Sequence, residues 1–161
     1  MTRTSSAPQH TLTRFGDRPV IYFAGSIRAG RDDVPTYAAL IERLSGYGQV
    51  TTEHVGDYSL SVKGQARLSD RHIHDRDLRW LRASDIVVAE VTTASLGVGY
   101  EIATAVAWRI PVVALYRGEE GTLSAMIAGS PGVRTHRYSD LGEAFTVIDT
   151  ALADFDGKAE S

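Results

Sequence analysis

Two short segments carry the residue types that could do chemistry, and each follows an apolar, strand-like run. Tyr22 to Arg28 passes through Gly25 and Ser26 to an arginine, and Ser95 to Glu101 passes through two glycines to a carboxylate. Glycine lets backbone amides approach an oxyanion, a serine hydroxyl donates to it, and an arginine binds phosphate through a planar fork. Together the two segments could hold an anionic sugar beside a nucleophile, which indicates nucleotide chemistry.

Each segment also has an interpretation without function. The loop from Gly25 to Gly30 lacks the spacing of a dinucleotide loop and of a triphosphate-binding loop, and alone it is more typical of a strand-end turn with a solvated arginine. Ser95 precedes a helix pattern whose N-terminus would offer unpaired amides to an anion. Glu101 lies one turn into that helix, so it is either a nucleophile or a carboxylate favourably placed near a helix start.

Asp77 is the second candidate carboxylate, and it lies in the charged run from His72 to Leu81. Such runs are usually the solvated face of an amphipathic helix. His72 and His74 are two residues apart and therefore do not share a helix face, so no metal site is expected. His54 and His136 carry no sequence cue for catalysis and are typical of hydrogen-bonded structural histidines.

Composition limits the remaining possibilities. A chain of 161 residues that is 43% hydrophobic can close one core, and we expect a single catalytic domain over residues 19–155 between mobile tails at 1–18 and 156–161. A net charge of −3 argues against binding a nucleic-acid polymer. The absence of cysteine excludes disulfides and thiolate catalysis. No apolar run is long enough for a membrane span, so the sequence predicts a soluble cytoplasmic protein.

The apolar periodicity predicts five strands that alternate with helices. The expected strands are Val20 to Ala24, Val50 to Val55, Asp85 to Val91, Val112 to Tyr116 and Val133 to Tyr138. The expected helices are Val34 to Ser45, Asp70 to Ala83, Gly97 to Trp108, Thr122 to Ala128 and Leu141 to Phe155. This alternation predicts an α/β three-layer sandwich around a five-stranded parallel sheet, flavodoxin-like or Rossmann-like. The irregular stretch from Gly56 to Ser69 is a candidate flap.

Ligands of such sheets bind beyond the carboxyl ends of the strands, where the candidate residues lie. At that edge several blocks resemble the 2′-deoxynucleoside 5′-monophosphate N-glycosidases, of the 5-hydroxymethyl-dUMP N-hydrolase type, within the nucleoside 2-deoxyribosyltransferase group. The resemblance extends from about Val20 to Met126, and Asp75 and Arg76 depart from the family's pattern. The matching blocks are Tyr22 to Arg28, Thr52 to Val55, Ile73-His74 with Asp77-Leu78 and Trp80-Leu81, Asp85 to Val91, Ser95 to Glu101, and Leu123 to Ile127.

The resemblance implies hydrolysis of the N-glycosidic bond of a deoxynucleoside 5′-monophosphate, with no cofactor and no metal. It implies that Glu101 is the nucleophile of a double displacement, that Asp77 orients or protonates the leaving base, and that Tyr22 lies beside the sugar. It further implies a substrate-binding set and a homodimer in which Ser124 completes the neighbouring phosphate site. That set is Gly25, Ser26, Ile27, Arg28, Gly30, His54, Ser95, Gly97, Gly99, Ser124 and Met126.

From the residues alone, Tyr22, Ile27 and Met126 could equally be core residues and Ser124 an ordinary helix residue. Two other functions also stay open. A deoxyribosyltransferase would pass the sugar to another base, although Arg28 and the serines argue for a 5′-phosphate that plain nucleosides lack. A noncatalytic nucleotide-binding module would keep the anion site without the chemistry, and the presence of both Glu101 and Asp77 argues against it.

Overall fold

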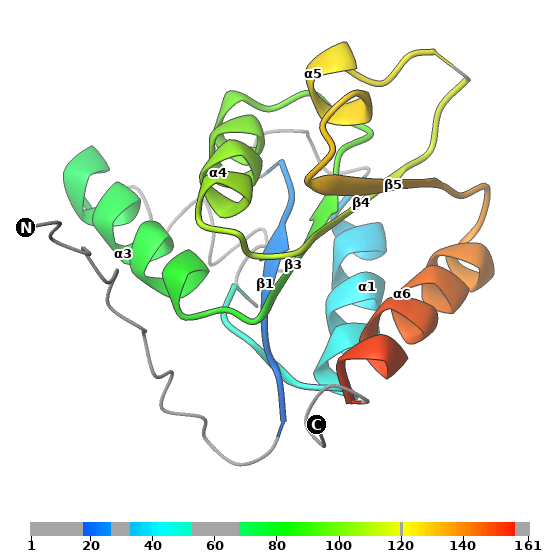
Figure 1. The fold of residues 1–161 in the computed structure, drawn as a ribbon, viewed down its shortest axis with the longest axis horizontal. Helices are drawn as coiled ribbons and strands as arrows, with labels where there is room; N and C mark the ends of the chain where they lie inside the picture. The colour runs from blue at the N-terminus through cyan, green and yellow to red at the C-terminus, as the bar shows by residue number, and fades with distance from the viewer. Residues whose placement is uncertain (1–17, 27–32, 53–67, 120, 157–161) are drawn as a thin grey trace, which may run out of the picture.

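The computed structural model describes residues 18–26, 33–52, 68–119 and 121–156, with side chains up to residue 153 (Figure 1). The expected tails lie outside these residues for the most part. Arg18, the last residue of the expected N-terminal tail, donates hydrogen bonds to the carbonyls of Ser45, Gly46 and Tyr47. The elements in chain order are β1 (Val20–Ala24), α1 (Val34–Ser45), β2 (Gln49–Val50), α3 (Asp70–Arg82), β3 (Ile86–Glu90), α4 (Leu96–Ala107), β4 (Val112–Tyr116), α5 (Ala125–Ala128), β5 (Val133–Arg137) and α6 (Leu141–Asp156).

The five strands form one parallel sheet in the order β2-β1-β3-β4-β5, which confirms the predicted fold class. In the central pair, Ile21 lies opposite Ile86 and Ala24 opposite Ala89. The chain leaves β1 toward β2 on one side and returns to β3 on the other, so the strand order reverses between β1 and β3. A crevice for ligands is expected at the carboxyl ends of those two strands.

The two faces of the sheet are covered by different helices, which gives three layers (Figure 1). Side chains that alternate along β1 and β3 divide between the two faces. Ile21 and Phe23 pack with α1 and α6, whereas Tyr22 and Ala24 pack with α3 and α4. Because β1, β3 and most of β4 are buried on both faces, their sequences are continuous apolar runs rather than alternating patterns, except for Glu90 at the end of β3.

Most predicted boundaries agree with the structure to within one residue, and two were wrong. The second strand ends at Val50, because the hydroxyl of Thr52 turns inward and bonds both the amide and the carbonyl of Phe23, and residues 53–55 of the predicted strand lie outside the described residues. The fifth helix begins at Ala125 instead of Thr122. Ser124, the residue before the helix, has a ψ of 128°, which is extended rather than helical, so the helix cannot start before Ala125.

No helix among the described residues is long and apolar enough to cross a membrane.

Candidate active site

Tyr22 and Glu101 form the centre of the candidate site. The phenol of Tyr22, on β1, donates a hydrogen bond of 2.7 Å to Oε1 of Glu101, in the second turn of α4. Tyr22 is 2% exposed, so its ring is also part of the core, as the alternative interpretation of this residue expected. A strand residue and a helix residue 79 positions apart are thus held together at the edge where the strand order reverses.

Burial controls the protonation of this pair. Burial raises the pKa of the Glu101 carboxyl to about 7. The hydrogen bond from Tyr22 lowers this pKa, and the nearby charge of Asp77 raises it. Burial and the nearby Glu101 carboxylate raise the pKa of the Tyr22 phenol far above its usual range. Tyr22 therefore remains a proton donor at any physiological pH, and Glu101 changes charge near neutrality.

Asp77 approaches the same pair from α3, where the sequence predicted it. Its carboxylate is bound by its neighbour Arg76, whose Nε donates a hydrogen bond of 2.8 Å to Oδ1. Asp77 and Arg76 are both largely buried, with side chains 19% and 17% exposed. Arg76 also lies over the ring of Trp80 at 4.7 Å. Sequence reasoning treated Arg76 only as a departure from a pattern and missed its contact with Asp77.

The exit of β1 is tightly packed. A Cβ on Gly25 would lie 3.1–3.2 Å from the rings of Tyr37 and Phe23, so the absence of a side chain lets the chain turn against them. Ser26 is 6% exposed, and its amide donates to the phenol oxygen of Tyr37 at 3.2 Å. The contact with Tyr37 was not predicted, because nothing local in the sequence distinguishes it from other apolar positions of α1. Ile27, Arg28, Gly30 and His54 lie outside the described residues.

At the start of α4, Ser95 is the N-cap residue, and its Oγ accepts a hydrogen bond of 3.4 Å from the amide of Val98. Its hydroxyl proton remains available to an anion, since a capping oxygen only accepts. A Cβ on Gly99 would meet nothing within 4 Å among its surroundings, and one on Gly97 would meet only Ser95, at an ordinary contact distance. The packing does not require glycine at either position, so both leave the helix entrance open.

Ser124 and Met126 do not join the carboxylates. They line a cleft of about 670 Å³ between α4 and α5, together with Ser95, Leu96 and Gly99. Met126 is 83% and Leu96 97% exposed. Ser124 precedes α5 without capping it through its side chain. Within one chain this cleft is separate from Tyr22, Glu101 and Asp77, which do not line it.

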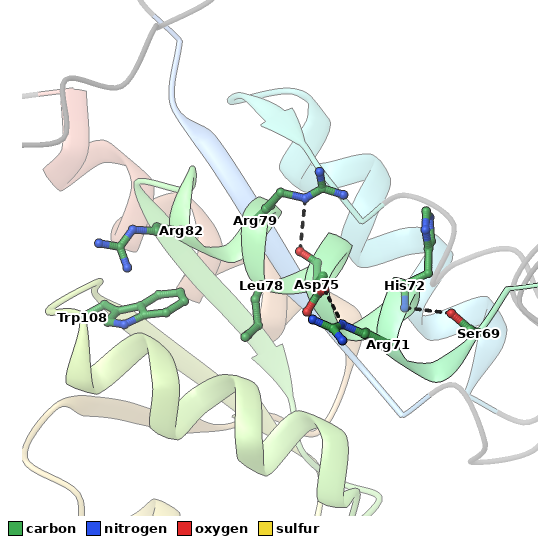
Figure 2. Close-up of a pocket in the computed structure, with 8 residues that line it drawn as sticks. All are labelled: Ser69, Arg71, His72, Asp75, Leu78, Arg79, Arg82 and Trp108. Atoms are coloured by element: carbon green, nitrogen blue, oxygen red, sulfur yellow. Dashed lines mark hydrogen bonds and ion pairs between the residues drawn. The ribbon is translucent and has the colours of Figure 1, made fainter.

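A second hollow, on the outer side of α3, is also about 670 Å³ in volume and contains none of the candidate residues. Figure 2 shows three arginines along it, of which Arg71 pairs with Asp75 and Arg79 donates to the backbone carbonyl of Asp75. Arg82 lies over the ring of Trp108 at 4.9 Å. These contacts account for the arginines as parts of an exposed helix face, as expected for most charges of this run.

No three His, Cys, Asp or Glu side chains in the described part of the chain are grouped so that they could hold a metal ion.

With this geometry established, comparison with known proteins defines the class. The family model for nucleoside 2-deoxyribosyltransferase matches residues 21–146, and the chain belongs to that family. It is 49% identical over 124 residues to a 5-hydroxymethyl-dUMP N-hydrolase of Danio rerio. The aligned residues cover 76% of this chain and 87% of the relative. The human protein of the same name is 50% identical over 115 residues, 70% of this chain and 66% of the relative. The chain is thus an N-glycosidase, a hydrolase of N-glycosidic bonds.

The solved structure of a CMP N-glycosidase, BcmB, of Clostridium botulinum has the same fold. It superposes with a TM-score of 0.57 over 82% of this chain and 98% of its own, at 15% sequence identity. The resemblance stated from the sequence blocks is confirmed at the level of the family, and the roles of individual site residues stay predictions.

Proposed function

We propose that this protein hydrolyses the N-glycosidic bond of 2′-deoxynucleoside 5′-monophosphates and releases the free base and 2-deoxyribose 5-phosphate. The observation that carries the proposal is the Tyr22–Glu101 hydrogen bond beside Asp77, at the point where the strand order reverses. The names of the relatives support a deoxynucleotide, and 5-hydroxymethyl-dUMP is the first substrate to try.

The reaction proceeds by two displacements at the anomeric carbon. In its ionised form Glu101 attacks through Oε2 while Tyr22 holds Oε1; the C–N bond breaks, and its electron pair leaves with the base. Asp77, oriented by Arg76, positions the leaving base; in the second displacement it takes a proton from the attacking water and passes that proton to the base. Water then attacks the same carbon, the ester to Glu101 breaks, and the carboxylate is restored. The phosphate lies between the loop from Gly25 to Gly30 and Ser95 at the start of α4.

The activity is tested by incubating the protein with 5-hydroxymethyl-dUMP, dGMP, GMP and deoxyguanosine separately, without any acceptor base, and measuring free base by chromatography. We expect base from the deoxynucleotides only. Glu101→Gln should abolish release, whereas Glu42→Gln, a change at an exposed glutamate of α1, should leave it intact. Release that requires an added acceptor base would identify a transferase, and unchanged turnover by Glu101→Gln would refute the nucleophile.

We further propose a homodimer in which Ser124 of each protomer reaches the phosphate site of its partner. The exposed Leu96 and Met126 beside the α4–α5 cleft support a protein partner there, because side chains of this kind rarely stay in water together. The Ser124 side chain does not cap α5, so its hydroxyl is available to such a site.

Mixing two inactive variants tests this arrangement. A mixed dimer contains one Glu101→Gln protomer and one Ser124→Ala protomer. The protomer that keeps Glu101 has an intact site only if Ser124 reaches it from the partner. After denaturation and refolding at equal concentrations, half of the dimers are mixed, so activity should return to about a quarter of wild type. A mixture that stays as inactive as its components would refute the shared site. Leu96→Glu should yield monomers in analytical ultracentrifugation.

A further inference from the structure

A buried carboxylate lies at the carboxyl end of β3, on the face of the sheet opposite the Tyr22–Glu101 pair. Glu90 is fully buried and continues the row of Ile86 and Val88 toward α1 and α6. The Thr92 hydroxyl and amide both bond to it, and the Tyr138 phenol donates to its Oε1 at 3.0 Å. Burial raises the pKa of the Glu90 carboxyl, and these donors oppose that rise. The mechanism proposed above uses none of these groups.

Arg117, directly after β4, connects this carboxylate to two loops. Its Nη2 forms an ion pair with Oδ1 of Asp33, and its Nε lies 3.9 Å from Oε1 of Glu90. Its backbone amide donates a hydrogen bond of 2.8 Å to the hydroxyl of Thr92. The second oxygen of Asp33 accepts a hydrogen bond of 2.9 Å from the hydroxyl of Thr93. The Arg117 guanidinium thus lies between Asp33 and the end of β3, and the Arg117 amide and Asp33 both bind the threonines that follow β3.

The joined segments are those that lead into the candidate phosphate site. Asp33 is the residue directly before α1 and directly after residues 27–32, which include Arg28. Thr92 and Thr93 begin the loop that ends at Ser95, the N-cap of α4. One cluster of charges thus fixes the start of the β3–α4 loop against Asp33, at the edge of the sheet.

We propose that Asp33 and Arg117 are positioning residues that hold the β3–α4 loop, and with it Ser95, in the position that binds the substrate's 5′-phosphate. This inference rests on the proposed function, since it assigns the phosphate to Ser95 at the end of that loop. Stability alone is a poor reason for the cluster, because a buried or partly buried ion pair often contributes little against the cost of desolvating its charges. Moreover, Nε of Arg117 is buried and makes no hydrogen bond within the described chain.

The test measures binding apart from chemistry. Asp33→Asn, Arg117→Gln, Arg117→Lys and the double variant Asp33→Asn/Arg117→Gln are compared with wild type by calorimetric titration with 2-deoxyribose 5-phosphate and with inorganic phosphate. Displacement of a binding group by about 1 Å is enough for roughly a hundredfold effect, so each neutralising variant should weaken both affinities by about tenfold or more. The double variant should lose no more than either single variant, since the two side chains act as one unit.

Three further readouts separate positioning from a merely structural role. In assays with the substrate that wild type hydrolyses fastest, the KM of the neutralising variants should rise. Their kcat should stay within about twofold of wild type, because Tyr22 and Glu101 lie on the other face of the sheet. Arg117→Lys should recover part of the affinity through its charge. Arg134→Gln, which removes an exposed arginine of β5 outside the cluster, should change neither affinity nor KM.

Unchanged affinities together with a lowered melting temperature in Asp33→Asn and Arg117→Gln would overturn the positioning role. Wild-type protein that binds 2-deoxyribose 5-phosphate but releases no base would refute the proposed hydrolysis alone, and the affinities of the variants would still decide this inference. Wild-type protein that binds neither phosphate compound would overturn this inference and the phosphate assignment together.

Discussion

Replacing Glu101 by glutamine should make the protein more stable, and increasingly so as pH rises. The pKa of Glu101 is about 7 in the folded protein and 4.5 as a model value for the unfolded chain. Below pH 4.5 both states bind the proton and Glu101 has no effect of this kind. Between pH 4.5 and 7 the unfolded chain releases its proton while the folded protein retains it, so the folded state loses stability. Above pH 7 the loss is complete.

The size of the effect follows from the difference between the two pKa values. One pKa unit corresponds to 1.36 kcal/mol, and the difference is about 2.5 units, so ionised Glu101 costs the folded state about 3 kcal/mol. Glutamine has nearly the same shape, cannot ionise, and still accepts the hydrogen bond from Tyr22. Glu101→Gln should therefore match wild type near pH 4.5 and exceed it by about 3 kcal/mol at pH 8, which corresponds to a melting temperature higher by roughly 7–14 °C.

Urea denaturation of wild type and Glu101→Gln between pH 4.5 and 8.5, followed by circular dichroism, measures this difference directly. Glu42→Gln, the same substitution at an exposed position, is the matched control. A difference between Glu101→Gln and wild type that does not change with pH would show that Glu101 is not held in a desolvated site. The explanation of its pKa by burial would then be wrong.

Two other variants test neighbouring parts of the site. Tyr22→Phe removes the hydrogen bond that lowers the pKa of Glu101, a buried bond to a charged group worth about 1.5–3 kcal/mol. The rise of kcat/KM with pH, which reports ionisation in the free enzyme, should move from about pH 7 upward by about one to two units; an unmoved profile would contradict the pairing. Gly25→Ala places a Cβ 3.1 Å from the buried ring of Tyr37, so overpacking should lower the free energy of unfolding by about 1–3 kcal/mol in the same denaturation assay. Equal or higher stability would mean that Tyr37 has room to move.

The sheet could be predicted because its strands are buried on both faces. A strand such as Val112–Tyr116 must be apolar along its whole length, and the helices between such runs leave only a parallel sheet. The two errors occurred where one residue decides the local structure. Thr52 ends β2 by bonding across to Phe23, and the extended backbone of Ser124 delays the start of α5, and neither effect is visible in the apolar pattern.

The candidate site likewise contains residues that the local sequence predicts and residues that only the fold brings together. Loop residues such as Ser95 were found because a serine before a helix has a recognisable local role, whether as a cap or as an anion donor. The Tyr22–Glu101 pair needed either the family resemblance or the structure, since the two residues are 79 positions apart. Their types and places at strand and helix ends suggested chemistry, but only the fold sets the 2.7 Å contact and the burial that raises the pKa of Glu101 to about 7.

One signal in the sequence was available and was not used. Glu90 ends a strand of four apolar residues, and a carboxylate in such a run must either face solvent or find buried partners. Apart from the neighbouring Thr92, its partners Tyr138 and Arg117 lie far along the chain, and the Asp33–Arg117 ion pair beside it spans 84 positions. A charged side chain is buried only when other groups bind it through hydrogen bonds or ion pairs. A single charged residue inside an apolar strand therefore indicates where loops from different parts of the chain must meet. Here that meeting point lies at the start of the loop that ends at Ser95, which we assign to the phosphate.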